Sequence, residues 1–342
     1  MPGPAPAAPL TLDEARSLFT PLAGADAILL AVSGGPDSTA LMGLAAAIAA
    51  DLPRLAVATV DHGLRPGSRD VAEAVATQAA ALGLGAQILT WVGAKPVTRI
   101  QETARRERYR LLTDAARALG ASHLVTAHTL DDQAETVLLR MSRGSGVAGL
   151  AGMAACVTRD GIAHVRPFLG VPKCSLVATC LSLRLPVAAD ASNTDPRFAR
   201  ARLRRLMPML AEEGLDARRF AVLAGRMAEA SAVIDRMARC ALLDGAVPGE
   251  PGCYAGVRLL HEPGAVLNRA LELMLGQVGS GRPRLEPIER LAGELRAAAA
   301  AQAPLQRNLL GVLVAFDGVD RLRLRPEPPR RPASSLPPRP AG

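Results

Sequence analysis

One stretch decides the fold of this chain: AILLAVSGGPDS, residues 27–38. Its first six residues form an apolar run, which is typical of a β-strand that is covered by helices on both faces. The two glycines that follow allow a tight turn, and the pattern of a helix begins directly after them. Strand, glycine-rich turn and helix together predict the first unit of a parallel α/β sheet.

The same alternation continues to about residue 185. After the strand within 27–32, further strands are expected at 55–60, 86–92 and 123–128. Between them, amphipathic stretches predict helices at 38–50, 69–83, 100–119 and 131–143. Because crossovers between parallel strands are right-handed, we expect a Rossmann-like, doubly wound parallel sheet with its site at the carboxyl ends of the strands.

The second half of the chain has a different, mainly helical pattern. Apolar residues at alternating steps of three and four between Phe220 and Ala241 predict one long helix, and others are expected at 263–276 and 286–300. The runs at 312–316 and 321–325 predict a closing β-hairpin. We therefore expect a partly disordered N-terminal tail, an α/β domain, a smaller helical domain and a disordered tail, at 1–20, 21–215, 216–325 and 326–342.

The charge of the chain is basic. Lys and Arg number 40 against 32 Asp and Glu, the formal net charge is +8, and only Lys95 and Lys173 are lysines. The guanidinium fork of Arg suits phosphate backbones, but a genome rich in G and C would favour Arg as well. The charge alone is therefore a weak indication of nucleic-acid binding.

The cysteines and the apolar runs indicate the cellular compartment of the protein. The five cysteines form no CxxC pair, and no stretch has the basic start and apolar run of a signal peptide. The apolar run at 25–32 is broken long before it could span a bilayer. A cytoplasmic protein with ordinary reduced thiols is expected.

The turn at 33–38, SGGPDS, is the first candidate site. Its N–H groups, its hydroxyls and a helix N-terminus would form a cradle for an anion. Asp37 alone would repel phosphate, so its position makes sense with a Mg²⁺ ion between them. A capped turn would explain the first three residues alone, and no Gly-Lys-Ser/Thr of a Walker A loop follows. All six residues resemble the signature loop of the N-type ATP pyrophosphatases, the PP-loop family, which implies cleavage of ATP between its α and β phosphates.

Two shorter motifs are less specific. Asp61 and His62 end the second expected strand, where Rossmann-like folds contact a nucleoside, but a capping turn would explain them equally well. Arg105 and Arg108 are three residues apart on an expected helix and share one face. By themselves they would be a solvated basic face.

The later motif HTLDDQAET, residues 128–136, is followed by RGSG at 143–146. On a helix that begins near Asp131, Asp132 and Glu135 project from the same face. Two carboxylates at a phosphate site can hold Mg²⁺ or an incoming ammonium group, although an Asp at a helix start also interacts favourably with the helix dipole. Further on, DASNTD at 190–195 is typical of an Asx-type turn before an Arg-rich helix.

From residue 128 to 146 the sequence resembles the tRNA(Ile)-lysidine synthetase family nearly residue for residue. The resemblance covers about 25–210, and in looser form the region to about 325. It implies an ATP-dependent ligase that adenylates O2 of cytidine 34 in the CAU anticodon of a minor isoleucine tRNA. The amine of L-lysine then displaces AMP to form lysidine. Because every motif suited to phosphate or metal lies before Asn193, we expect residues beyond about 215 to position the tRNA.

The resemblance also implies roles for individual residues. The implied catalytic residues are Asp37, Asp132, Glu135 and Arg105, with Asp37 and Asp132 also holding Mg²⁺. The implied ATP-binding residues are Ser33, Gly34, Gly35, Pro36, Asp37, Ser38, Asp61 and His62. The implied tRNA-binding residues are Arg108, Arg143, Ser192, Asn193 and Arg202. The alternative within the superfamily is a tRNA thiolase, which usually carries the CxxC pairs that are missing here.

Overall fold

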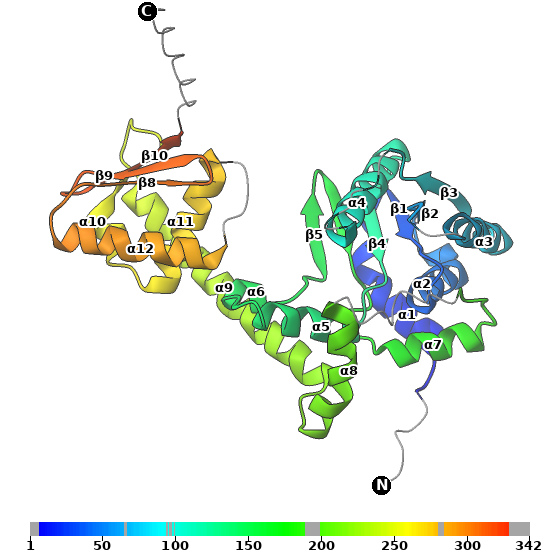
Figure 1. Cartoon of the computed structure of the whole chain (residues 1–342). Helices are drawn as coiled ribbons and strands as arrows, with labels where there is room; N and C mark the ends of the chain where they lie inside the picture. Colours follow the sequence, from blue (N-terminus) through cyan, green and yellow to red (C-terminus); the bar gives the residue numbers. More distant parts are fainter. Residues whose placement is uncertain are drawn as a thin grey trace, which may run out of the picture. The chain divides into compact units, whose positions relative to one another are not determined.

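The computed structural model describes residues 7–64, 67–93, 95, 98, 100–188, 199–279 and 284–327. The chain divides into two compact units, Met1–Gly144 with Gly149–Arg226, and Ser145–Ala148 with Met227–Gly342 (Figure 1). We expected a boundary at 215, but it falls inside helix α9 (Ala217–Gly245). The first turns of α9 belong to the first unit because Phe220 and Ala224 pack against Ala134 and Val137.

A six-stranded sheet forms the centre of the first unit, in the order β3-β2-β1-β4-β6-β5. All neighbouring pairs are parallel except β5 with β6. The order reverses between β1 and β4, so the expected doubly wound parallel sheet is confirmed. The strands are β1 (Ala27–Ala31), β2 (Arg54–Asp61), β3 (Gly85–Thr90), β4 (His123–Thr126), β5 (Cys156–Arg159) and β6 (Ile162–Val165). The last two were not expected, and β5 is largely exposed, without the continuous apolar run of the other strands.

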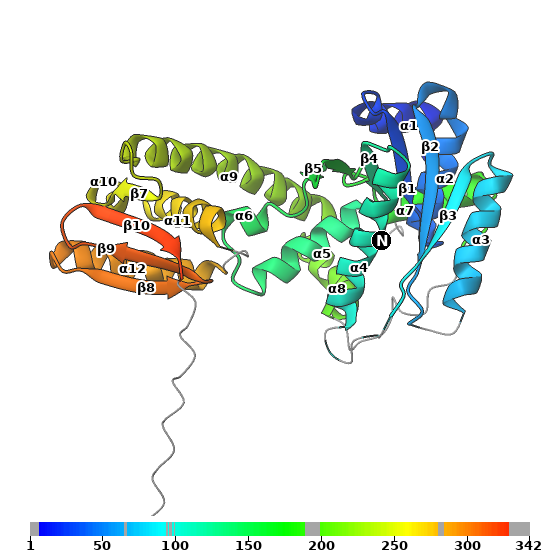
Figure 2. The ribbon, with the colours of Figure 1, turned by 90° about the horizontal axis from the view of Figure 1, so that it is seen from above.

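The first strand explains why its sequence is apolar throughout. Leu29 belongs to one buried cluster, with Leu112 and Ala116 of α4 (Ile100–Ala118). Ile28 and Leu30 belong to another, with residues of the helices α1 (Leu12–Phe19), α2 (Pro36–Ala47), α3 (Ser68–Ala81) and α7 (Lys173–Ser182). Successive side chains of a strand point to opposite faces, so helices cover both faces of the sheet (Figure 2).

The helices of the first unit are α1 (Leu12–Phe19), α2 (Pro36–Ala47), α3 (Ser68–Ala81), α4 (Ile100–Ala118), α5 (Leu130–Met141), α7 (Lys173–Ser182) and α8 (Ala199–Glu212), with short 3-10 turns at Thr20–Leu22 and Ala49–Asp51. Four of them, α2 to α5, lie close to the expected positions, and α8 is the expected Arg-rich helix. The sequence pattern did not predict α1 or α7. Helix α1 lies within the segment that we expected to be a partly disordered tail. A capping box between Thr11 and Glu14 begins it, and Phe19 is buried edge-on against Phe168, with ring centroids 6.1 Å apart.

The second unit contains a four-stranded antiparallel sheet in the order β7-β10-β9-β8. The expected hairpin is confirmed as β9 (Val312–Phe316) and β10 (Arg321–Pro326), and the sequence pattern missed β7 (Cys253–Ala255) and β8 (Leu305–Leu309). Buried residues of α11, α12 and the sheet form one core. The remaining elements are α10 (Gly256–Leu260), α11 (Gly264–Val278), α12 (Leu285–Ala300), most of α9, and the short α6 (Val147–Leu150), which spans the boundary between the units.

Among the residues that the structure describes, no helix combines the length and the apolar character that a membrane crossing needs.

Candidate functional site

A cavity of about 760 Å³ lies at the carboxyl ends of β1, β2 and β4 in the first unit. This is the edge of the sheet where the sequence predicts the site. The cavity brings together residues from the loop after β1, from α4 and from α5. The expected site residues that line it are Ser33, Gly35, Pro36, Asp37, Ser38, His62, Arg105, Arg108 and Asp132.

The 33–38 loop is held by its own hydroxyls. The backbone N–H of Ser33 donates to Oγ of Ser38 at 3.1 Å, and that hydroxyl donates to the carbonyl oxygen of Gly35 at 3.1 Å. Gly34 has φ +84, and a Cβ there would lie 3.0 Å from a methyl group of Val71. Gly34 therefore shapes the turn without lining the cavity, and α2 begins with its N-terminus at the loop.

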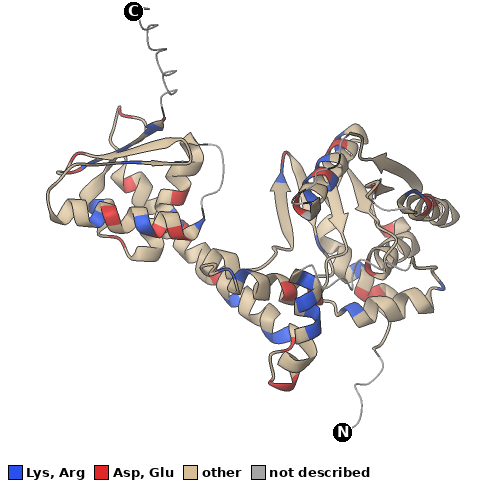
Figure 3. Cartoon of the chain, viewed as in Figure 1, with Lys and Arg blue, Asp and Glu red and all other residues tan. Residues whose placement is uncertain are grey.

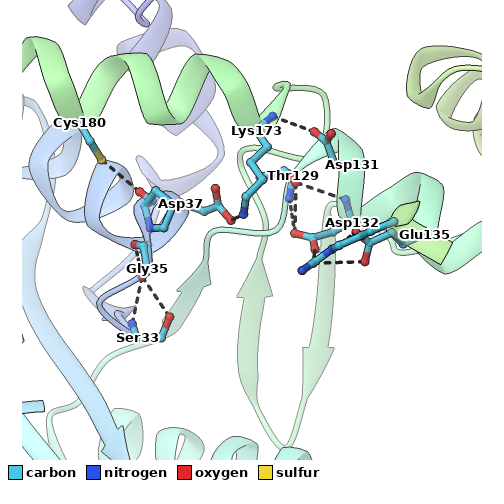
Figure 4. Close-up of polar contacts among 12 residues, drawn as sticks. Ser33, Gly35, Asp37, Thr129, Asp131, Asp132, Glu135, Lys173 and Cys180 are labelled. Carbon is cyan, nitrogen blue, oxygen red and sulfur yellow. Dashed lines mark hydrogen bonds and ion pairs between the residues drawn. The ribbon is translucent and has the colours of Figure 1, made fainter. Parts of the chain in front are cut away.

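Asp37 projects from the first turn of α2 into the cavity. Its Oδ2 accepts a hydrogen bond from the ammonium of Lys173, while its Oδ1 is buried and has no hydrogen-bond partner (Figure 4). Burial raises the pKa of Asp37, and the Lys173 ammonium opposes that rise. The hydrogen-bonding capacity of Oδ1 is thus unused.

Asp132 is positioned by the start of α5. Its Oδ2 accepts from the backbone N–H of Thr129 at 3.0 Å, and its own N–H donates to the Thr129 hydroxyl at 3.3 Å, which completes a capping box. The other oxygen, Oδ1, lies 3.7 Å from a guanidinium nitrogen of Arg204. Asp132 therefore caps α5 and lines the cavity at the same time.

Glu135 was expected to project from the same face of α5 as Asp132, and both carboxylates contact Arg204. The side chain of Glu135 is only 3% exposed, however, and it is absent from the cavity lining. Its Oε1 accepts from Nε of Arg204, which lines the cavity. Burial raises the pKa of Glu135, and Arg204 opposes the rise. The carboxylates of Asp132 and Glu135 thus contact the same guanidinium, that of Arg204.

Asp61 also does not line the cavity. Its carboxylate accepts hydrogen bonds from the Ser68 hydroxyl and from the N–H of Gly63, the latter at 3.0 Å. These bonds hold the turn after β2, and the hydrogen bond from Ser68 keeps the pKa of Asp61 below its ordinary value. His62 is the member of this motif that faces the cavity.

Guanidinium groups gather along another wall of the cavity. Arg105 and Arg108 of α4 lie 5.1 and 5.5 Å from the ring centroid of Tyr109, and Arg200 of α8 lines the same cavity. His128 is nearby, and its burial lowers its pKa to about 3, so it is neutral at physiological pH. The positive charge on this wall therefore comes from arginine.

The remaining expected tRNA-binding residues lie elsewhere. Arg143 and Arg202 are exposed and do not line the cavity. Ser192 and Asn193 lie outside the described residues. Basic residues also mark α8, shown in blue in Figure 3. They are Arg200, Arg202, Arg204 and Arg205.

The sequence pattern did not assign Lys173, Arg200 or His128 to the site, although all three line the cavity. Arg204 also lines the cavity, and in the sequence it belongs only to an Arg-rich segment. Lys173 had one available signal, since it is one of only two lysines in an Arg-rich chain.

Comparison with known proteins first gives the class. The family profile described as a PP-loop domain matches residues 11–210. Among solved structures, the U34-tRNA thiolase NcsA from Methanococcus maripaludis, with its 4Fe–4S cluster, matches with a TM-score of 0.55 and 16% identity, over 64% of this chain and 78% of that chain. At this low sequence identity, the similarity shows a shared fold alone. The chain is thus a PP-loop protein, and proteins of this class use ATP.

Curated relatives then give the family. The tRNA(Ile)-lysidine synthase of Methylobacterium sp. strain 4-46 is 49% identical over 336 residues, which are 95% of this chain and 97% of the relative. That of Methylobacterium nodulans is 52% identical over 320 residues, 90% and 92% of the two chains. The chain belongs to the tRNA(Ile)-lysidine synthase family and is an ATP-dependent ligase.

Proposed function

We propose that this chain joins the side-chain amine of L-lysine to C2 of cytidine 34 in the CAU anticodon of a minor isoleucine tRNA, in the cytoplasm. ATP would be split to AMP and pyrophosphate, with an adenylated cytidine as the intermediate. One observation carries the proposal: a single cavity holds the 33–38 loop, the carboxylates of Asp37 and Asp132, and a wall of arginines. Family membership supplies the substrate class.

Mg²⁺ fits the carboxylates of this cavity. The buried Oδ1 of Asp37 has no hydrogen-bond partner, and Asp132 lines the same cavity. No group of three His, Cys, Asp or Glu side chains suited to a metal gathers in the described part of the chain. That suits Mg²⁺, which is commonly bound by one or two carboxylates together with substrate phosphates and water. When bound, the ion would offset negative charge on the phosphates.

The chain's own groups would carry out the first half-reaction as follows. The N–H groups of the 33–38 loop and the N-terminus of α2 face the phosphates and stabilise negative charge there. Oxygen O2 of the cytidine attacks the α phosphorus, and the bond to the β phosphate breaks. This step is needed because a carbonyl oxygen is a poor leaving group until it becomes a phosphate ester.

In the second half-reaction the lysine amine must arrive uncharged at C2. Glu135 is the carboxylate that we propose to orient the amine and accept its proton. Because Glu135 is buried and bound to Arg204, that role requires the guanidinium to move aside or to shift toward the other partner, Asp132. The arginine wall, with Arg105 and Arg108, would face the anionic RNA backbone.

The thiolase alternative is favoured by no observation. All five cysteines are free, and within the described residues none of them forms part of a metal-binding group.

The experiment is direct. Purified protein is incubated with ATP, labelled L-lysine and a transcript of the isoleucine tRNA, and the nucleosides are analysed by mass spectrometry. Lysidine that appears only with both ATP and lysine supports the proposal, and a transcript with U in place of C34 serves as the control. Sulfur incorporation, or ATP cleavage without nucleoside modification, would contradict it.

A further inference from the structure

The arginines of α4 fall into two groups with different partners. Arg106 and Arg110 pair with the carboxylate of Glu107, at 3.9 and 2.8 Å. Arg105 and Arg108 line the cavity instead, and within the part of the chain that the structure describes neither forms an ion pair with a carboxylate. The two arginines of this helix that reach the cavity are therefore held by something other than an acid.

Tyr109 is the common neighbour of both cavity arginines. Cζ of Arg105 lies 5.1 Å and Cζ of Arg108 lies 5.5 Å from its ring centroid, within the range of a cation–π interaction. Burial raises the pKa of Tyr109, but the positive charges of Arg105, Arg108 and Arg166 outweigh burial, so the pKa lies below its ordinary value. The phenolic Oη is buried and has no hydrogen-bond partner. The contact with the arginines is therefore made by the ring.

The ring of Tyr109 is itself supported from the sheet. It stacks on the imidazole of His164, with ring centroids 5.7 Å apart and an interplanar angle of 19°. His164 belongs to β6, against which α4 packs, and it is only 3% exposed. Burial lowers the pKa of His164, so its imidazole is neutral at physiological pH and adds no positive charge beside the arginines. The sheet thus fixes the ring, and the ring contacts both guanidiniums.

An aromatic ring holds a guanidinium without using its N–H donors. A carboxylate partner would occupy those donors, and an anionic ligand would have to displace it. Arg204 shows this contrast in the same cavity, since Glu135 accepts its Nε–H. Arg105 and Arg108, which rest on a ring, keep the guanidinium fork for phosphate oxygens. Holding the two side chains before binding also lowers the rotamer entropy that is lost when a ligand orders them.

We propose that Tyr109 is a positioning residue that holds Arg105 and Arg108 in place for a phosphate of the RNA strand that carries the reacting cytidine. This inference rests on the proposed function, in which these arginines face the RNA backbone. Tyr109 does not line the cavity, so it acts through the two guanidiniums and does not touch the RNA.

Binding of the isoleucine tRNA transcript to the full chain, without ATP or lysine, tests this role. Tyr109→Leu should weaken tRNA binding by about fivefold to tenfold, through the loss of two cation–π interactions. Tyr109→Phe keeps the ring and should bind tRNA within about twofold of the parent. ATP binding should be unchanged in both variants. Equal weakening by Phe and Leu would overturn the proposal, and so would weakened ATP binding with tRNA binding unchanged, which would assign these arginines to the nucleotide.

A double-mutant cycle shows whether Tyr109 acts through the arginines. Arg105→Met should weaken tRNA binding about tenfold in the parent but only about twofold in the Tyr109→Leu background, where the guanidinium is no longer held. The matched control is Arg106→Met, whose guanidinium lies 3.9 Å from Glu107, and its effect should be the same in both backgrounds. Additive effects of Arg105→Met and Tyr109→Leu would contradict a positioning role.

Phe19→Leu controls for the loss of an aromatic ring from the interior of the same unit. It removes the ring that packs edge-on against Phe168, so it should lower the melting temperature but leave tRNA binding unchanged. If its tRNA binding falls as far as that of Tyr109→Leu, the cause is a general loss of stability and the proposal is wrong. Failure of the proposed function gives a different result: the parent protein would bind tRNA in a way that depends on Tyr109 but form no lysidine.

Discussion

Asp37 has two carboxylate oxygens in different situations, one bound to Lys173 and one buried without a partner. An Asp37→Asn substitution keeps the shape of the side chain but removes the charge that a metal and an ammonium both require. We expect tRNA-dependent pyrophosphate release to fall by about two orders of magnitude or more. Asp114→Asn, an exposed carboxylate on α4, is the control. Turnover near that of the parent would remove Asp37 from the metal site.

Also at the residue scale, a substitution of Glu135 tests the two half-reactions separately. If it receives the lysine amine, Glu135→Gln should still form adenylated tRNA but transfer lysine at least about tenfold more slowly, since a proton acceptor contributes on the order of 10²–10⁴ to a rate. The adenylated intermediate should accumulate and can be trapped by omitting lysine. Collapse of adenylation itself would place this carboxylate with ATP. A thermal melt shows whether loss of the Glu135 charge beside Arg204 has destabilised the fold.

At the scale of elements, helices α5 and α1 both begin with a capping box, but only that of α5 lies beside the cavity. Thr129 and Asp132 form the capping box of α5 beside the cavity, and Thr11 and Glu14 form that of α1 away from it. Thr→Ala at either position should cost about 1 kcal/mol of stability. Only Thr129→Ala should also weaken ATP binding, because it removes the hydroxyl that bonds both Oδ2 and the backbone N–H of Asp132. Equal ATP affinity in the two variants would mean that the cap does not position this carboxylate.

At the scale of the whole molecule, the basic second half of the chain is proposed to hold tRNA. Arg218 and Arg219 are exposed at the start of α9. Replacing both with Ala should lower tRNA affinity and flatten the log–log salt dependence by about one unit per lost phosphate contact, with ATP binding intact. The paired control replaces Arg110 and Arg117, which form ion pairs with Asp114. An unchanged slope in the first double variant would show that these arginines do not contact the backbone.

The sheet and much of the site could be predicted because their signals are local. An apolar run followed by SGGPDS predicts strand, turn and helix within twelve residues, and Asp132 follows its cap by three. The short strands β5 and β6, and the role of α1 in the core, could not be predicted in this way. They exist because neighbouring elements pair with them or bury them, which no short window of sequence contains.

The sequence by itself determined the doubly wound sheet, the position of the candidate site at the strand ends and the family of the chain, since each depends on residues close together along the chain. Only the tertiary structure decided which charges meet. Lys173 reaches Asp37 across 136 positions, and Arg204 reaches Glu135 across 69. Such pairs depend on where each crossover returns its helix to the sheet. The same geometry made Glu135 a buried partner of arginine and left one buried oxygen of Asp37 without a hydrogen-bond partner.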